Sequence, residues 1–122
     1  MKKRISILGA TGSIGTQTVD ILSSIDAEVV ALTTNRNIKL LEEQARALKP
    51  KLCVAFDEDA AKSLKIALAD TSIQVQAGMD GLISAATHAD CDTVVTAVVG
   101  MVGLLPTLAA IRAGKDIALD SW

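Results

Sequence analysis

The sequence is nearly devoid of aromatic residues, with one Phe, one Trp and no Tyr among 122 residues. Because 50% of the residues are nonetheless hydrophobic, the core must be built from Ile, Leu, Val and Ala. Such side chains suit a parallel sheet whose two faces are both covered by helices. The length suits one domain with a substantial core.

Positive charge is not in excess either, since Lys+Arg number 12 and Asp+Glu number 14, for a net charge of −2. Nucleic-acid-binding surfaces need a basic stripe, so we expect no nucleic-acid partner. No apolar run reaches membrane-spanning length. The run after the basic residues 1–4 ends at Gly9, which is too short for a signal peptide. We therefore expect a cytoplasmic protein with no membrane association.

Chemically reactive residues are few. Cys53 and Cys91 lie far apart in the sequence without a C-x-x-C motif, which predicts reduced, partly buried thiols rather than a disulfide or redox pair. The sole histidine, His88, lies in segment 88–92, whose spacing fits no standard zinc pattern, so we predict a surface-loop histidine. The acids at 57–59 are explained by the dipole at the start of a helix rather than by a metal. The sequence thus predicts neither catalytic residues nor metal ligands.

What the sequence does contain is a regular alternation of short β-branched runs and amphipathic segments. This pattern predicts a doubly wound, mostly parallel sheet in a three-layer α/β/α, NAD(P)-binding Rossmann-like fold with right-handed crossovers. Ligands of such folds bind at the carboxyl ends of the strands. The predicted strands are 4–8, 27–33, 52–56, 73–77 at an edge, 93–99, and one that begins at 116.

Two predicted helices carry specific expectations. A buried apolar stripe is predicted on the first helix, formed by Ile14, Thr18, Ile21, Leu22 and Ile25. The last helix follows a turn at 100–103, and Pro106 is tolerated there only in the first turn. Gly114 is predicted to be the C-cap glycine of that helix.

A glycine-rich turn, Gly-Ala-Thr-Gly-Ser-Ile-Gly at 9–15, joins the first predicted strand to the first predicted helix. Gly9 allows a tight turn, Gly12 lets the backbone approach phosphates, and Gly15 lets the helix pack closely. The helix N-terminus offers free N–H groups and a positive dipole end to an anion. The spacing is G-x-x-G-x-x-G rather than the usual G-x-G-x-x-G, so a turn that binds nothing remains the alternative.

The loop after the second predicted strand, Thr-Thr-Asn-Arg-Asn at 33–37, has no acid. NAD-binding folds usually place Asp or Glu there to hold the ribose 2′-OH. Arg36 instead attracts a 2′-phosphate and can bind it bidentately, with Thr34, Asn35 or Asn37 as further donors. The loop therefore predicts NADP(H), if the glycine turn holds a dinucleotide. The alternative is a solvated arginine, although a cation near a helix N-terminus is mildly unfavourable.

Three segments together closely resemble the N-terminal domain of the 1-deoxy-D-xylulose 5-phosphate reductoisomerase family. They are the glycine turn at 9–15, the strand and loop at 29–37, and the run GLLPTLAAIRAGK at 103–115, which is far more specific than the turn. The resemblance implies an enzyme that rearranges and reduces 1-deoxy-D-xylulose 5-phosphate to 2-C-methyl-D-erythritol 4-phosphate in non-mevalonate isoprene biosynthesis. It also implies NADPH, a divalent cation (Mg²⁺, Mn²⁺ or Co²⁺), a sugar phosphate substrate and a homodimer.

The resemblance also assigns residues to parts of the cofactor. It places the pyrophosphate at 11–14, the adenosine 2′-phosphate at 35–37, and the end of the central strand near the cofactor. The family often has Gly-Lys-Asn at 35–37, so Arg36 keeps the charge, whereas Asn35 departs from the pattern. The predicted cofactor-binding set is Gly9, Thr11, Gly12, Ser13, Ile14, Gly15, Asn35, Arg36, Asn37, Ala97 and Val98.

The likeness stops at about Leu119. The family continues into Ala-Asn-Lys-Glu, whose residues touch cofactor and substrate, whereas this chain reads Asp-Ser-Trp at 120–122. The resemblance places the metal-binding carboxylates, the substrate site and the dimer contacts beyond this point. We therefore expect residues 1–122 to be an incomplete, truncated NADPH-binding domain that is inactive alone. The alternatives are the cofactor domain of another NADP-linked reductase (a semialdehyde or sugar dehydrogenase) and a folded α/β module without nucleotide binding.

Overall fold

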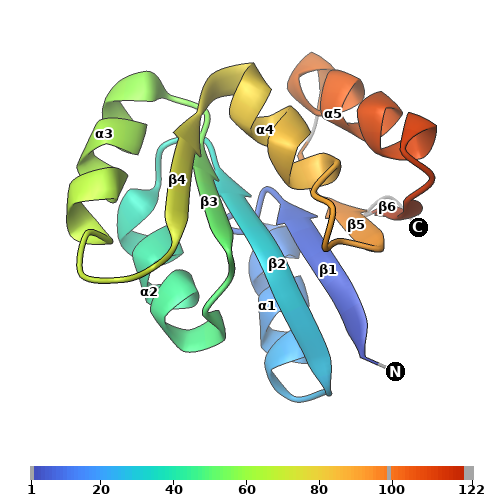
Figure 1. Ribbon diagram of the computed structural model, residues 1–122, viewed down its shortest axis with the longest axis horizontal. Helices are drawn as coiled ribbons and strands as arrows, with labels where there is room; N and C mark the ends of the chain where they lie inside the picture. The colour runs from blue at the N-terminus through green and yellow to red at the C-terminus, as the bar shows by residue number, and fades with distance from the viewer. Residues whose placement is uncertain (1, 99, 120–122) are drawn as a thin grey trace.

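Six parallel strands form the middle layer of the molecule (Figure 1), in the order β4-β3-β2-β1-β5-β6. The computed structural model describes residues 2–98 and 100–119. Every neighbouring pair of strands is parallel, so the predicted doubly wound fold is confirmed. The strands are β1 (Lys3–Leu8), β2 (Ala27–Thr34), β3 (Leu52–Ala55), β4 (Gln74–Ala77), β5 (Thr93–Thr96) and β6 (Asp116–Leu119).

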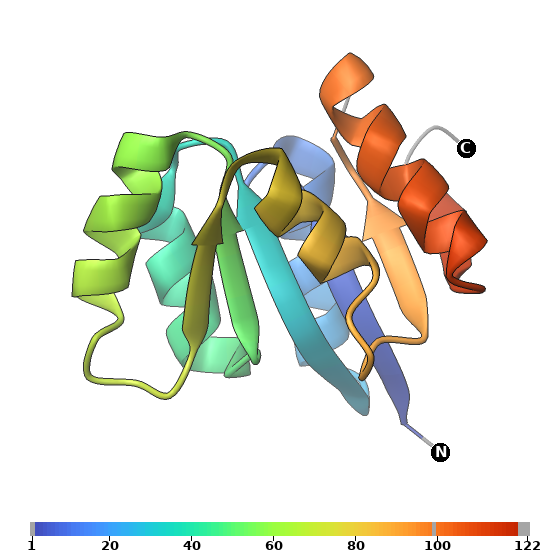
Figure 2. The same ribbon diagram turned by 45° about the horizontal axis from the view of Figure 1, so that its top comes forward.

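Five helices in the described part of the chain cover the two faces of the sheet (Figures 1 and 2). The first three pack into one apolar cluster with the sheet, and the last two into a second cluster on the other face. The predicted edge position of β4 is also confirmed. The helices are α1 (Ser13–Ser23), α2 (Ile38–Leu48), α3 (Glu58–Ala67), α4 (Gly78–Ala86) and α5 (Met101–Arg112).

The direction in which strands are added to the sheet reverses between β1 and β5. The strands β1 to β4 extend the sheet to one side, and the chain then returns to place β5 and β6 on the other side of β1. Loops that leave two such neighbouring strands diverge to opposite faces, which opens a crevice at their carboxyl ends. The fold therefore places a ligand site beyond the ends of β1 and β5.

The buried face of α1 differs from the predicted stripe. Ile14, Ile21 and Ile25 are 37%, 61% and 56% exposed, and the buried residues of the helix are Gly15, Val19 and Leu22. Only Leu22 of the predicted stripe is buried. The reason is steric: α1 packs with its smallest residue against the preceding turn, as described below, and this contact rotates the isoleucines toward solvent.

Helix α5 begins earlier than expected, at Met101, so that Pro106 lies inside the helix rather than in its first turn. The Pro106 ring is buried, and this packing offsets the helical hydrogen bond that a proline nitrogen cannot donate. Gly103 lies within this helix, and a Cβ there would lie 2.7 Å from the carbonyl oxygen of Val98, so the position requires glycine. Gly114 follows the helix with φ +80, as a glycine that ends a helix does.

The acidic segment at 57–59 begins α3. Asp57 is the N-cap residue, and its carboxylate accepts a 2.9 Å hydrogen bond from the Ala60 N–H. Glu58 and Asp59 occupy the first turn, where negative charge is stabilised by the helix dipole. Asp57 therefore has a structural role in this fold.

Replacing the N-cap tests that role. We expect Asp57→Ala to lower the free energy of unfolding by about 1 kcal/mol, because the Ala60 N–H loses its acceptor. Asp57→Asn keeps an acceptor oxygen without the charge, and should retain most of the stability. Urea denaturation followed by circular dichroism measures both variants; equal losses would show that the charge, and not the hydrogen bond, stabilises α3.

Candidate functional site

A hollow of about 390 Å³ opens at the carboxyl ends of the strands, where the order of the sheet reverses. Its wall is formed by the end of β2, by the loops that follow β1, β2, β3 and β5, and by residues of α4 and α5. This volume lies in the range of small-molecule and cofactor sites. The lining residues are Gly9, Thr11, Gly12, Thr33, Thr34, Asn35, Phe56, Leu82, Ala97, Val98 and Val102.

Two hydrogen bonds join the glycine turn to the end of β2. The Gly9 N–H donates to Thr33 Oγ1 at 2.9 Å, and the Ala10 N–H donates to the Thr33 carbonyl at 2.8 Å. Gly9 has φ +84, and a Cβ there would lie 3.1 Å from the backbone of Ala97. The expected tight turn at Gly9 is therefore present, and it lies directly against the end of β5.

Gly15 and Gly12 face different surroundings. A Cβ at Gly15 would lie 1.9 Å from the carbonyl oxygen of Gly9, so α1 packs against the turn at a distance that no side chain permits. A Cβ at Gly12 would meet nothing closer than that same oxygen at 3.8 Å, and Gly12 has an extended conformation that other residues adopt. The fold thus requires glycine at 15, whereas at 12 glycine leaves open space in front of the backbone.

The N-terminus of α1 has no side-chain cap and no acid in its first turn. Helices α2 and α3 are capped by Asn37 and Asp57, whereas α4 and α5, like α1, have no side-chain cap. Since Gly12 lines the hollow, the free N–H groups and the positive dipole end of α1 lie at its wall. This is the arrangement that binds phosphate groups at helix N-termini.

Two hydroxyl groups join the turn to the loop that follows β2. Thr11 Oγ1 and Thr34 Oγ1 are 2.6 Å apart and share a hydrogen bond, and Thr34 Oγ1 also accepts from the Asn37 N–H at 3.3 Å. From α2, the buried Gln44 amide donates to the Ala10 carbonyl at 2.8 Å. The turn is therefore held from two sides before any ligand arrives.

Six of the predicted cofactor residues line this hollow, and five do not. Ser13, Ile14 and Gly15 form the first turn of α1 and are not among the lining residues. Asn37 caps α2, because its Oδ1 accepts from the Leu40 N–H at 3.3 Å. The residues brought to the hollow are Gly9, Thr11, Gly12, Asn35, Ala97 and Val98.

Arg36 lines an adjoining hollow instead, together with Asn35, Phe56 and the acidic segment 57–59. Asn35 and Phe56 line both hollows, so the two adjoin at these residues. Among the residues that line either one, Arg36 is the sole cation. The loop after β2 supplies Arg36, and the tertiary structure brings the acids at the start of α3 beside it.

Sequence reasoning missed three apolar lining residues, Phe56, Leu82 and Val102, and the supporting Thr33. Thr33 had a signal: it is a hydroxyl residue at the end of an otherwise apolar strand, and it is 1% exposed. The apolar three had none: Phe56 follows β3, Leu82 was expected to face the core from its helix, and Val102 was expected in the turn at 100–103 but lies in the first turn of α5. Their contribution depends on which elements the topology brings to the crevice.

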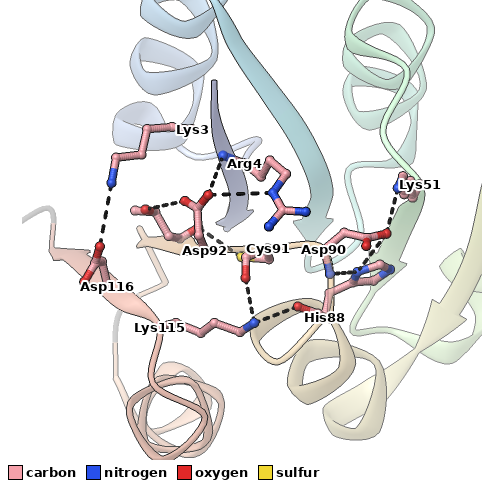
Figure 3. Close-up of polar contacts among 10 residues, drawn as sticks. Lys3, Arg4, Lys51, His88, Asp90, Cys91, Asp92, Lys115 and Asp116 are labelled. Carbon is pink, nitrogen blue, oxygen red and sulfur yellow. Dashed lines mark hydrogen bonds and ion pairs between the residues drawn. The ribbon is translucent and has the colours of Figure 1, made fainter. Parts of the chain in front are cut away.

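The histidine and Cys91 lie elsewhere, at the amino ends of the strands (Figure 3). Lys115 Nζ donates to the carbonyl oxygens of His88 at 2.9 Å and Cys91 at 2.6 Å. His88 Nδ1 accepts from the Asp90 N–H. A hydrogen bond from Lys51 at 2.6 Å holds the pKa of the Asp90 carboxyl below its usual value. These hydrogen bonds hold the loop before β5 in place, and Lys115 therefore has a structural role away from the hollow.

Both cysteines are free, and both are more buried than expected. Burial alone raises the pKa of the Cys53 thiol to about 12, so its reactive thiolate is scarce at neutral pH.

Within the described residues, no group of three or more His, Cys, Asp or Glu side chains is placed to hold a metal ion. No helix in that part of the chain is long and apolar enough to cross a membrane.

Gly15 and Gly12 give different expectations on substitution by alanine. We expect Gly15→Ala to lower the free energy of unfolding by about 2–3 kcal/mol, because the new methyl group overlaps the Gly9 carbonyl. Helix propensity alone would favour alanine by about 1 kcal/mol, so the sign separates the two effects. Gly12→Ala should cost less than about 1 kcal/mol. Urea denaturation measures both, and a stabilised Gly15→Ala variant would refute the close contact.

Comparison with known proteins extends over nearly the whole chain. The family model for 1-deoxy-D-xylulose 5-phosphate reductoisomerase matches residues 5–121. The reductoisomerase of Agathobacter rectalis is 58% identical over 118 residues, which are 96% of this chain and 31% of the relative. That of Lachnoclostridium phytofermentans is 51% identical and covers 95% and 30%. This chain therefore spans about a third of the length of the curated relatives that it matches.

Solved structures of reductoisomerases are also similar to nearly the whole of this chain. The Zymomonas mobilis reductoisomerase in complex with NADPH superposes with a TM-score of 0.93 at 41% identity, over 98% of this chain and 32% of that one. A reductoisomerase in complex with NADPH, fosmidomycin and magnesium superposes with a TM-score of 0.90 at 35% identity, over 94% and 29%.

Proposed function

This chain belongs to the 1-deoxy-D-xylulose 5-phosphate reductoisomerase family, and we propose that its residues 1–122 form the NADPH-binding domain of such an enzyme. The observation that carries the proposal is the uncapped N-terminus of α1, whose N-cap residue, Gly12, lies in the wall of the crevice. The NADPH complex of the Zymomonas mobilis relative supports it.

In the proposed binding mode, the pyrophosphate lies at the start of α1. The backbone N–H groups of Ser13 and Ile14 and the Thr11 hydroxyl donate to it, and the open space in front of Gly12 lets the phosphate approach the backbone. Ala97 and Val98 hold the cofactor by apolar contact beside Gly9. Gly9 and Gly15 act through the shape of the turn rather than by contact with the cofactor.

The adenosine 2′-phosphate lies at Arg36 in this proposal. Among the described residues that line the two hollows Arg36 is the sole cation, and Asn35 lines both. The Asn37 oxygen is engaged in capping α2, which leaves its amide NH₂ to donate. An anionic 2′-phosphate pairs with the positive guanidinium of Arg36 more strongly than a neutral 2′-hydroxyl does, so we expect NADPH to be preferred over NADH.

The whole enzyme is proposed to convert 1-deoxy-D-xylulose 5-phosphate to 2-C-methyl-D-erythritol 4-phosphate in non-mevalonate isoprenoid biosynthesis. Bound NADPH supplies the hydride, and the residues of this chain bind and orient it. Because the described residues include no metal-holding group, we place the divalent cation and the sugar phosphate in other parts of the enzyme, and expect this chain alone to be inactive. On the family resemblance, we extend the proposal to a cytoplasmic homodimer.

Titration of the chain with NADPH and NADH tests the proposal. We expect NADPH to bind more tightly, and Arg36→Ala to weaken NADPH binding by about 10- to 100-fold while leaving NADH unchanged, because a charged hydrogen bond contributes about 1.5–3 kcal/mol. Arg112→Ala is the matched control, since it removes an exposed cation at the far end of α5. If the chain binds neither dinucleotide, it is an α/β module without nucleotide binding.

The acids in the Arg36 hollow give a second expectation. Glu58 lines that hollow and would repel a 2′-phosphate. We therefore expect Glu58→Gln to tighten NADPH binding by about 2- to 5-fold at low salt, with a smaller effect at high salt, where exposed charges are screened. NADH binding should not change. Glu43→Gln, at an exposed position on α2, is the control; an equal gain from that variant would mean that net charge alone is responsible.

A further inference from the structure

Phe56 is the sole phenylalanine of the chain, and it lines both the hollow at the glycine turn and the hollow at Arg36. We propose that Phe56 presents an aromatic face on which the adenine ring of NADPH stacks. This inference rests on the proposed function, since it assigns one part of that cofactor to one side chain.

Backbone hydrogen bonds fix the position of this residue. The Phe56 N–H donates to the Thr34 carbonyl at 2.9 Å, and the next N–H, that of Asp57, donates to the Asn35 carbonyl at 3.0 Å. The end of β3 therefore runs directly beside the loop that carries Arg36. Phe56 is half-buried and packs against the apolar cluster that includes Leu82, so part of its side chain is supported while the rest is open to the hollows.

The chemistry of NADPH assigns the adenine to this place. The adenine and the 2′-phosphate are bonded to the same ribose, so a phosphate at Arg36 brings the base within one sugar of that residue. The nicotinamide lies on the other side of the pyrophosphate, farther from Arg36. In the Arg36 hollow every other lining residue is polar or charged. Phe56 is thus the surface on which a flat aromatic base gains contact by stacking.

The test measures the affinities of the chain for NADPH, for 2′,5′-ADP and for reduced nicotinamide mononucleotide by calorimetry. Phe56→Leu keeps an apolar side chain but removes the ring, and Phe56→Trp keeps an aromatic face. Met79→Ala is the control for packing, because Met79 packs against the same cluster but does not line either hollow. Thermal unfolding confirms that each variant is folded.

We expect Phe56→Leu to weaken NADPH and 2′,5′-ADP by the same factor of about 10, with Phe56→Trp and Met79→Ala close to the unchanged protein. The mononucleotide, which lacks adenine, should bind equally to all variants. Unchanged affinity of Phe56→Leu for 2′,5′-ADP, or an equal loss for the mononucleotide, would overturn the inference while leaving the proposed function intact. Failure of the unchanged chain to bind NADPH and 2′,5′-ADP would overturn the proposed function itself.

Discussion

The contact between Gly15 and the carbonyl oxygen of Gly9 is the constraint on which the site depends. Because no Cβ fits between them, α1 lies against the turn that precedes it, and this contact decides which face of the helix is buried. Val19 and Leu22 then face the sheet, while Ile14 and Ile21 face solvent. The same contact presents the first N–H groups of α1 at the wall of the crevice.

Groups on neighbouring elements hold the glycine turn in place. Thr33 and the buried Gln44 do this from β2 and α2, with hydrogen bonds to the backbone of residues 9 and 10. Both side chains are buried, and losing a hydrogen bond there would leave a buried polar group unpaired, which is costly. The glycine turn is therefore a property of three neighbouring elements and not of its own seven residues.

The segment most typical of the family contributes to the fold more than to the crevice. Within 103–115, Gly103 and the buried Pro106 pack α5 at the end of β5, and Lys115 clamps the loop before that strand. None of these residues lines either hollow. A segment can thus identify a family while acting on the cofactor site only by positioning β5 and the start of α5.

The sequence by itself determined the alternation of strands and helices, the parallel sheet, the tight turn at Gly9 and the glycine required at 15, because these follow from hydrophobic periodicity and from local backbone geometry. It also placed Arg36 in a loop at the carboxyl end of a strand. Only the tertiary structure decided that Asp57 to Asp59 and Phe56 meet Arg36, that Thr33 holds the turn, and that α1 buries Val19 instead of its isoleucines. Those outcomes depend on which strands become neighbours and how closely a helix approaches a turn, and residues far apart in the chain carry no local signal of either.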